Sequence, residues 1–449
     1  MAPNMIGDFF GATAASVCVL PFESLALPTQ FGSSAAALTG PVNRFTGVDV
    51  EFHGPIGLGQ ATVNGRFFDF ENGDSETFLR NRFDGLVETD GNSLNVIDAG
   101  PFSAQRTERF ATVDPMVSPN TGFALYAVFG QPEIISVASP SSGGVVGRSK
   151  LAENGSPIPR DRVFVNYSYF DAAALTPNGI SVHRVTPGFE KTFLDGRASW
   201  ELRAPFASTL NSDIRTDGVT DGGNGEFGNL TNYVKFLMTV NDVWSHSAGL
   251  GVTAPTGSDV NLVLVVPGGA TFLTIRNDSF HVLPFLASLY TPNDQLFVQT
   301  FIQYDFDTNG SRVELSDQDA NGLPTGVLQP IGRAQDSTFV YISVSAGYWL
   351  YRNPTGEGRI SGFAPMVELH NNQSLQGEDV VVGTTNSGSL FQLGTGNRNL
   401  QVLNLTLGAT ATLGRSGSLT AAYVTPIGNG PDQQFDGEFR LLYNWYFGQ

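Results

Sequence analysis

Apolar and polar residues alternate along the last stretch of the chain, residues 438–447. One row consists of Phe439, Leu441, Tyr443, Trp445 and Phe447, and the other of Glu438, Arg440, Leu442, Asn444 and Tyr446. A repeat of two residues predicts a β-strand with two unlike faces. In a soluble sandwich the apolar row would face a core, whereas in a membrane-spanning β-barrel it would face lipid and the charged row would face the lumen.

The same alternation recurs from about residue 160 onwards and predicts twelve strands, with fourteen as an alternative count. They cover residues 162–172, 182–193, 199–207, 231–241, 243–252, 279–290, 295–307, 337–351, 359–370, 400–413, 418–427 and 438–447. A tilted strand that crosses a membrane needs roughly 9 to 11 residues, and strands of soluble proteins average about 5 or 6. The length of the predicted strands therefore favours an all-β, antiparallel transmembrane barrel.

The connections between these strands alternate between long and short. The long ones are 208–229, 254–276, 308–336 and 371–399, and the tight turns are 194–197, 241–242, 291–294, 353–356 and 414–417. Outer-membrane barrels combine short periplasmic turns with longer extracellular loops. An even number of strands places both ends of the barrel on the short-turn side, so we expect the preceding region in the periplasm or folded into the lumen.

Residues 1–145 differ from the rest because small and turn residues separate short alternating runs at 45–52, 60–70, 93–97 and 123–129. Residues 139–144 have the composition of a linker. We therefore predict an N-terminal β-rich periplasmic or plug region at 1–145 and the barrel at 146–449. Residues 1–10 lack the basic start of a signal peptide, so an exported protein is expected to have been trimmed.

Aromatic residues cluster at the short-turn ends of the predicted strands. Such girdles mark the membrane interface of barrels. Trp349 falls on the row assigned to the inside, which requires a bulge or a reversed face there. The predicted interface belt consists of Trp200, Trp244, Tyr290, Trp349, Trp445 and Phe447.

Composition supports the barrel and excludes some functions. Charged residues make up 15% of the chain, against about 25% in typical soluble proteins, and no run of 18 apolar residues predicts a transmembrane helix. The net charge of −18 argues against nucleic-acid binding. It would favour cations in a lumen, or simply reflect a solvated acidic surface. Cys18 is the single cysteine, so no disulfide forms within the chain.

Charged residues recur on the rows predicted to face inward. A lipid-facing Arg or Lys costs roughly 2–4 kcal/mol at mid-bilayer, so such charges must face a lumen. They would either tune the selectivity of an open path or fill a narrow barrel with cross-strand ion pairs. The predicted lumen-lining residues are Arg162, Arg184, Glu190, Glu201, Arg203, Lys235, Asp305, Glu368 and Arg440.

Two related sequences of the form D-x-D-x-N-G raise the question of a Ca²⁺ site. They contain Asp305, Asp307 and Asn309, and Asp317, Asp319 and Asn321. Alternate side-chain oxygens of this kind can bind Ca²⁺, but a calcium loop ends in a bidentate Glu, where this chain has Ser316 and Leu328. Because Asp, Asn and Gly are also common in ordinary turns, we expect no cofactor and keep Ca²⁺ as the alternative.

Catalysis has little support in the sequence. The triplet Ser245-His246-Ser247 suggests a hydrolase, since some twelve-stranded barrels are phospholipases, but alternation places His246 opposite both serines. No GxSxG, HExxH, Walker or GxGxxG motif occurs in a supporting context. We predict that the protein is not an enzyme.

Two segments, GRSKLAENGSPIPRDRVFVNYSYF at 147–170 and VHRVTPGFEKTFLDGRASWELR at 182–203, resemble uncharacterised bacterial outer-membrane β-barrel proteins of porin-like or transporter-like type. The final strand is similar to their C-terminal insertion signal, although it ends Phe447-Gly448-Gln449 rather than on the aromatic residue. The resemblance implies an outer-membrane location and the barrel fold, and it supplies no catalytic or binding residues. Separately, we expect a channel for the passive or facilitated passage of small solutes, with outer-membrane lipid and the barrel-assembly machinery as partners. The alternatives are a non-conducting anchor whose long loops mediate adhesion or structural interactions, and, third, a secreted β-sandwich.

Overall fold

The computed structural model describes residues 2–8, the ten strands β1 to β10, and residues 146–449 except for 176–178, 216–223, 265–269, 319–322, 354, 378, 385–389, 395–399, 429–431 and 448–449. Side chains are described for residues 2–8 and for nearly all of the described residues from 146 onwards, but not for β1 to β10. In this part of the chain no helix is long and apolar enough to cross a membrane.

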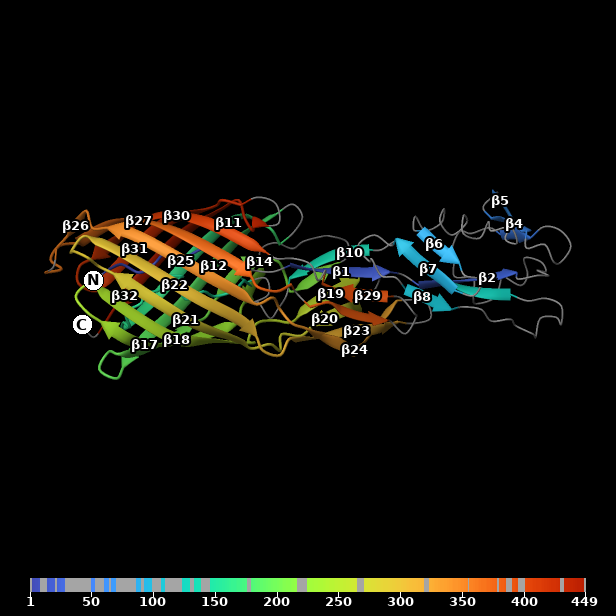
Figure 1. Cartoon of the computed structure of the whole chain (residues 1–449), viewed down its shortest axis with the longest axis horizontal. Coiled ribbons are helices and arrows are strands. Elements are labelled where there is room, and N and C mark those ends of the chain that lie inside the picture. The colour runs from blue at the N-terminus through green and yellow to red at the C-terminus, as the bar shows by residue number, and fades with distance from the viewer. Residues whose placement is uncertain are drawn as a thin grey trace.

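A closed antiparallel barrel of twelve strands dominates the structure (Figure 1). Each barrel strand pairs with its neighbours in the chain, and the first pairs with the last, so the predicted fold class is confirmed. The strands are β11 (Arg162–Ala173), β12 (Ile180–Phe193), β13 (Ala198–Arg203) with β14 (Phe206–Thr209), β17 (Leu230–Val240), β18 (Trp244–Ala254), β21 (His281–Tyr290), β22 (Leu296–Asp307), β25 (Phe339–Tyr348), β27 (Ile360–Ser374), β30 (Gln401–Leu413), β31 (Gly417–Pro426) and β32 (Gly437–Tyr446).

The barrel closes where β11 pairs with β32, from Arg162 opposite Tyr446 to Asp171 opposite Gly437. Along β32 the two rows separate as alternation predicts. Phe439, Leu441, Tyr443 and Trp445 are exposed on the outside, while Glu438, Arg440, Leu442 and Asn444 are buried inside. An apolar outer surface around a polar interior is the arrangement of a barrel that faces lipid.

One barrel strand is interrupted at Pro205, which separates β13 from β14. Proline has no backbone N–H, so it cannot donate a bond to the neighbouring strand. Its carbonyl still accepts a 2.9 Å hydrogen bond from the backbone N–H of Gly228. The strand then continues as β14, which pairs with β16 (Asn224–Phe227) and extends the barrel wall toward the long loops.

The long loops contain strands that the sequence patterns did not reveal. β15 (Asp213–Arg215), β19 (Val260–Leu264), β20 (Ala270–Ile275), β23 (Ser311–Gln318) and β24 (Pro324–Ala334) form a five-stranded sheet at one end of the barrel, called here the loop end. Their apolar side chains share a core with Val381, Phe391 and Leu393 from the loop that follows β27. Most of these strands have three to eight residues, too short for alternation to separate them from turns.

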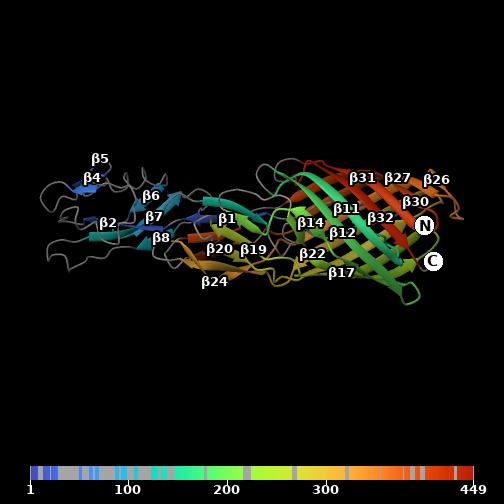
Figure 2. The same ribbon diagram turned by 180° about the vertical axis from the view of Figure 1, so that it is seen from behind.

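The N-terminal strands lie beyond the loop end of the barrel, away from the tight turns (Figures 1 and 2). β1 (Ala14–Leu20) pairs on one side with β10 (Glu133–Ala138) and on the other with β29 (Leu390–Leu393). β29 in turn pairs with β28 (Val381–Thr384). The remaining strands are β2 (Phe22–Pro28), β3 (Val50–Phe52), β4 (Gln60–Val63), β5 (Arg66–Asp69), β6 (Leu86–Thr89), β7 (Ser93–Asp98), β8 (Arg106–Arg109) and β9 (Phe123–Phe129).

The even strand count predicts the N-terminal region in the periplasm or folded into the lumen, and residues 2–8 do lie inside the barrel. Pairing between β1 and β29 ties the region to a barrel loop at the opposite end from the short turns. Within the N-terminal region, residues 2–8 are the ones whose side chains are described, and they lie in the lumen. The domain boundary at residue 145 stays a prediction.

Most of the predicted aromatic belt lies on the outer surface near the short turns. Trp200, Trp244 and Trp445 are exposed, Tyr290 contacts Trp244 at 4.5 Å between ring centroids, and Phe447 contacts Trp445 at 5.9 Å. Trp349 is wrongly assigned to this belt. It lies inside, with 5% of its surface exposed, because it continues the inward row of β25.

A positive charge on the outer row should lower the free energy of unfolding far more than a positive charge in the loop sheet. We expect Leu441→Arg, on β32, to lower the free energy of unfolding by about 2–4 kcal/mol in lipid vesicles. The matched control is Val327→Arg, which adds the same charge at an exposed apolar residue of β24 and should change it by about 0.5 kcal/mol or less. Urea unfolding followed by tryptophan fluorescence measures both. Equal costs would show that the outer row does not face lipid.

Candidate functional site

Two chain segments fill the interior of the barrel. The first lumen segment, residues 2–8, and the second lumen segment, residues 146–160, run antiparallel to each other. Backbone hydrogen bonds join them at 2.8 Å from the Met5 N–H to the Gly155 carbonyl and at 3.3 Å from the Asn154 N–H to the Ile6 carbonyl. Both segments are almost entirely buried. We call the two together the lumen plug.

Glycine makes the close packing of the plug feasible at two positions. Gly7 has φ of +82°, and a Cβ there would lie 2.6 Å from the Cα of Glu153 on the other segment. On the barrel wall, a Cβ at Gly408 would lie 2.7 Å from the Cδ1 of Ile6. Larger residues would therefore separate the two segments or push the first one off the wall.

The first lumen segment is fixed to the wall through its backbone and through Asp8. The carboxylate of Glu368 accepts hydrogen bonds from the N–H groups of Ile6 at 2.8 Å and Gly7 at 2.9 Å. Asp8 accepts from the side-chain amides of Asn372 at 3.0 Å and Asn404 at 2.8 Å. It also forms a buried ion pair with Lys150 of the second segment.

The second lumen segment is fixed by ion pairs with strands far apart around the wall. Arg148 contacts Asp305 of β22 at 2.6 Å. Glu153 contacts Arg184 of β12 at 3.1 Å and Arg440 of β32 at 2.6 Å. All five side chains are at most 4% exposed, so the charges of the plug and of the wall compensate each other away from water.

A further charged cluster connects the plug to β11, β12, β13 and β17. Arg162 contacts Glu190 at 2.8 Å and Glu201 at 2.9 Å, while Lys235 contacts Glu190 at 3.0 Å. Arg203 donates to Glu201 at 2.6 Å and to the Lys150 carbonyl at 2.6 Å. Arg162 also donates to the Asn154 carbonyl at 2.6 Å. Both the side chains and the backbone of the plug thus complete the hydrogen bonding of the wall.

All nine residues predicted to line the lumen are buried in the barrel interior. Seven of them contact the plug directly: Arg162, Arg184, Glu190, Arg203, Asp305, Glu368 and Arg440. Glu201 contacts Arg162 and Arg203, and Lys235 contacts Glu190. Whether they line a conducting path stays a prediction. The sequence patterns indicated a plug as one alternative for residues 1–145, but they did not identify residues 2–8 and 146–160 as the segments inside the barrel. The charged residues Asp8, Arg148, Lys150 and Glu153 were a usable signal for them.

The side chains of the first predicted Ca²⁺ sequence contact different groups in the structure instead of one shared site. Asp305 binds Arg148 and lies 2.6 Å from the Nδ1 of His281, whereas Asp307 accepts backbone hydrogen bonds from Asn309 at 3.1 Å and Gly310 at 2.9 Å, as in a turn. In the second sequence Asp317 accepts from the side chain of Gln329, and Asp319 and Asn321 lie outside the described residues.

A different grouping brings ligand atoms of His281, Asp307 and Asp336 within 4.8 Å of one another. The guanidinium of Arg148 lies 3.3 Å from Asp336, so a cation already compensates this cluster. The expectation of no cofactor, with Ca²⁺ as the alternative, stays a prediction.

The serines of Ser245-His246-Ser247 point into the barrel, and His246 points to its outer surface, as alternation predicts. The Nδ1 of His246 lies 2.8 Å from the Oγ of Ser288 on β21, and its ring stacks on Trp244. Among the described residues no carboxylate or amide contacts the other ring nitrogen, so nothing orients this pair for catalysis. The prediction that the protein is not an enzyme stays a prediction.

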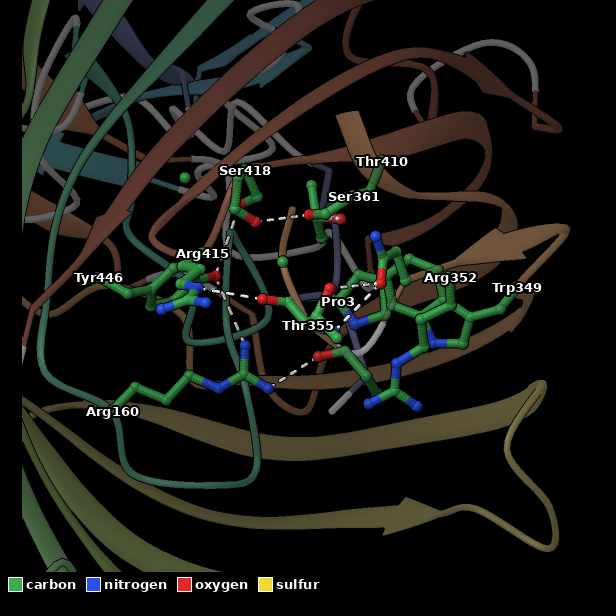
Figure 3. A pocket seen from close by; sticks show the side chains of 16 residues that line it. Pro3, Arg160, Trp349, Arg352, Thr355, Ser361, Thr410, Arg415, Ser418 and Tyr446 are labelled. Carbon is green, nitrogen blue, oxygen red and sulfur yellow. Dashed lines mark hydrogen bonds between the residues drawn. The ribbon is translucent and has the colours of Figure 1, made fainter. Parts of the chain in front are cut away.

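At the short-turn end, a cavity of about 480 Å³ lies between the plug and the wall (Figure 3). Ala2 and Pro3 of the first lumen segment form part of its lining, together with Trp349 and with the arginines Arg160, Arg352 and Arg415. This cavity is where Trp349 is located, instead of in the outer belt.

Comparisons with known proteins find solved structures that align with this chain, but they do not find a family. No protein-family model matches the chain, and no curated protein matches it. Among solved structures, an outer membrane channel from Pseudomonas putida F1 aligns at a TM-score of 0.41 and 13% identity, covering 65% of this chain and 97% of the channel. The β domain of the Bordetella autotransporter BrkA aligns at 0.38 and 14%, covering 64% and 100%. The P. putida toluene transporter TodX aligns at 0.37 and 10%, covering 68% and 96%.

Neutralising Glu368 should loosen the first lumen segment. In Glu368→Gln one accepting oxygen becomes an NH₂ group, and a hydrogen bond to a charged acceptor contributes about 1.5–3 kcal/mol. We expect amide hydrogen exchange at Ile6 and Gly7 to become about 10- to 100-fold faster. The control Glu357→Gln removes an exposed carboxylate and should leave both rates unchanged. Unchanged rates in Glu368→Gln would mean that this carboxylate does not hold the segment.

Proposed function

We propose that the protein is an outer-membrane barrel that anchors and displays its N-terminal region and long loops at the cell surface, for adhesion or structural interactions. This was the second of the two membrane functions suggested by the sequence. The observation that carries the proposal is the double passage of the chain through the lumen: residues 2–8 lead from the short-turn end toward the loop end, and residues 146–160 lead back to β11.

Support for the membrane location comes from the outer surface. Large apolar side chains are exposed on strands all around the barrel, among them Val165, Phe236, Leu286, Val367 and Leu407. An apolar surface that extends all around a barrel is rare on a soluble monomer. In bacterial barrels the short turns face the periplasm, which assigns the loop end, and with it β1 to β10, to the outside.

Support for a closed barrel comes from the contacts of the plug. Displacing the second lumen segment would separate Glu153 from two arginines and Arg148 from Asp305. Breaking a buried ion pair by removing one partner costs about 3–5 kcal/mol, and an entire domain is stable by only about 5–15 kcal/mol. Thermal opening of the whole lumen is therefore rare, which favours an anchor over a permanently open path.

A channel for small solutes, the first expectation from the sequence, is the second candidate function. Two observations favour it: the interior is polar and charged rather than apolar, and a cavity of about 480 Å³ opens at the short-turn end. In this alternative, local rearrangement of the plug would connect the cavity to the loop end, with the buried charges setting the selectivity.

Epitope tags inserted into the chain test whether the N-terminal region is displayed at the cell surface. A tag inserted between Asn72 and Gly73 should bind antibody on intact cells as efficiently as one inserted between residues 320 and 321, in the loop after β23. A tag between Asp195 and Gly196, in the tight turn after β12, should bind only after the outer membrane is permeabilised. If the tag at Asn72 also requires permeabilisation, the N-terminal region is periplasmic and the display proposal is wrong.

Conductance in planar bilayers separates the two functions. The full chain should give no current steps above background, because the plug fills the lumen, whereas deletion of residues 2–8 should produce discrete steps, because Glu368, Asn372 and Asn404 would then contact water. Val327→Arg, in the loop sheet, serves as the control and should stay silent. Steps from the full chain would favour the channel.

A further inference from the structure

Three arginines line the cavity at the short-turn end, Arg160, Arg352 and Arg415, and none of them forms an ion pair with an Asp or Glu among the described residues. Arg160 is 4% exposed, yet no carboxylate oxygen lies within 4.0 Å of its guanidinium among the described residues. The other buried arginines of the interior each have one: Arg148, Arg162, Arg184, Arg203 and Arg440. An unpaired buried charge is destabilising, so Arg160 is the place where a missing anion would be expected.

The hydrogen bonds of Arg160 orient it but do not neutralise it. Its Nη1 donates to the side-chain oxygen of Asn4 at 2.8 Å and its Nη2 to the Ala2 carbonyl at 2.7 Å. Its Nε is buried and has no partner among the described residues. Tyr446 lies beside the guanidinium, 5.7 Å from the ring centroid. Neutral acceptors therefore fix the direction of the group while its charge stays uncompensated.

Two more arginines complete the positive lining of the cavity (Figure 3). Arg415 donates from Nε to the Thr355 carbonyl at 3.0 Å, and Arg352 lies over the ring of Trp349 at 5.7 Å from its centroid. Neither has a carboxylate within 4.0 Å in the part of the chain that the structure describes, and no Asp or Glu lines the cavity. In a chain of net charge −18, this is a local concentration of positive charge.

We infer that this cavity binds a small anion through carboxylate or phosphate oxygens. Guanidinium groups bind such oxygens with paired N–H donors, and about 480 Å³ lies within the roughly 300–1,000 Å³ of small-molecule sites. Ser361, Thr412 and Ser418 add hydroxyl groups to the lining. The site opens at the end of the barrel opposite the N-terminal strands, so it does not depend on the display or channel function.

Titration calorimetry on the full chain in detergent micelles tests the site, with inorganic phosphate and citrate as the two probes. We expect saturable binding of at least one probe at one site per chain. The double variant Arg352→Gln/Arg415→Gln, which changes two exposed side chains, should weaken it by about tenfold or more. Arg197→Gln is the control, because Arg197 is exposed in the turn after β12, at the same end but outside the cavity, and it should leave the affinity unchanged.

Arg160→Gln should abolish binding, and its heat-dependent migration in SDS gels shows whether the barrel still folds. Saturation by phosphate alone or by citrate alone would each support the site and identify the class of its ligand. Two results would overturn the inference: no saturable binding of either probe, or an equal loss of affinity in Arg197→Gln and in the double variant, which would indicate only general attraction to positive charge.

Discussion

Compensation of buried charge between wall and plug is the interaction on which the structure depends. The inward arginines and carboxylates of the barrel are buried, and isolated charges away from water are destabilising. Glu153 contacts two arginines of the wall, and Glu368 receives two N–H groups of the first lumen segment. The barrel and its plug therefore stabilise each other, because each leaves the other with unpaired charges when it is absent.

Alternation predicted the barrel well because a membrane-facing strand repeats the same contrast over ten or more residues. Strand number, the order of long and short connections, and the inward direction of residues such as Arg162 and Glu190 all follow from it. Trp349 was misassigned only because its aromatic character was given more weight than its place in the inward row. For that residue the period of two was the better guide.

The plug and the cavity could not be predicted in the same way. Residues 2–8 belong to no strand in the described part of the chain, so their position depends on contacts with distant residues, such as that of Ile6 with Glu368, some 360 positions away. The arginine cavity joins Arg160, Arg352 and Arg415 from three separate stretches of chain. No local pattern carries such information, and the loop strands were missed because most are too short to show a repeat.

The seam between β11 and β32 makes the barrel a ring that encircles two segments of its own chain, residues 2–8 and 146–160. The N-terminal strands are paired into sheets beyond one end of the ring (Figure 1), and two chain segments already fill its interior. The strands therefore cannot be drawn back through the ring without unfolding. A pull on them is therefore shared by the whole hydrogen-bonded circumference instead of by a single strand, and extraction requires the seam to open. The same geometry bears on assembly: once β11 and β32 pair, both lumen segments are enclosed by the ring, so closure of the seam is the step that locks them in place.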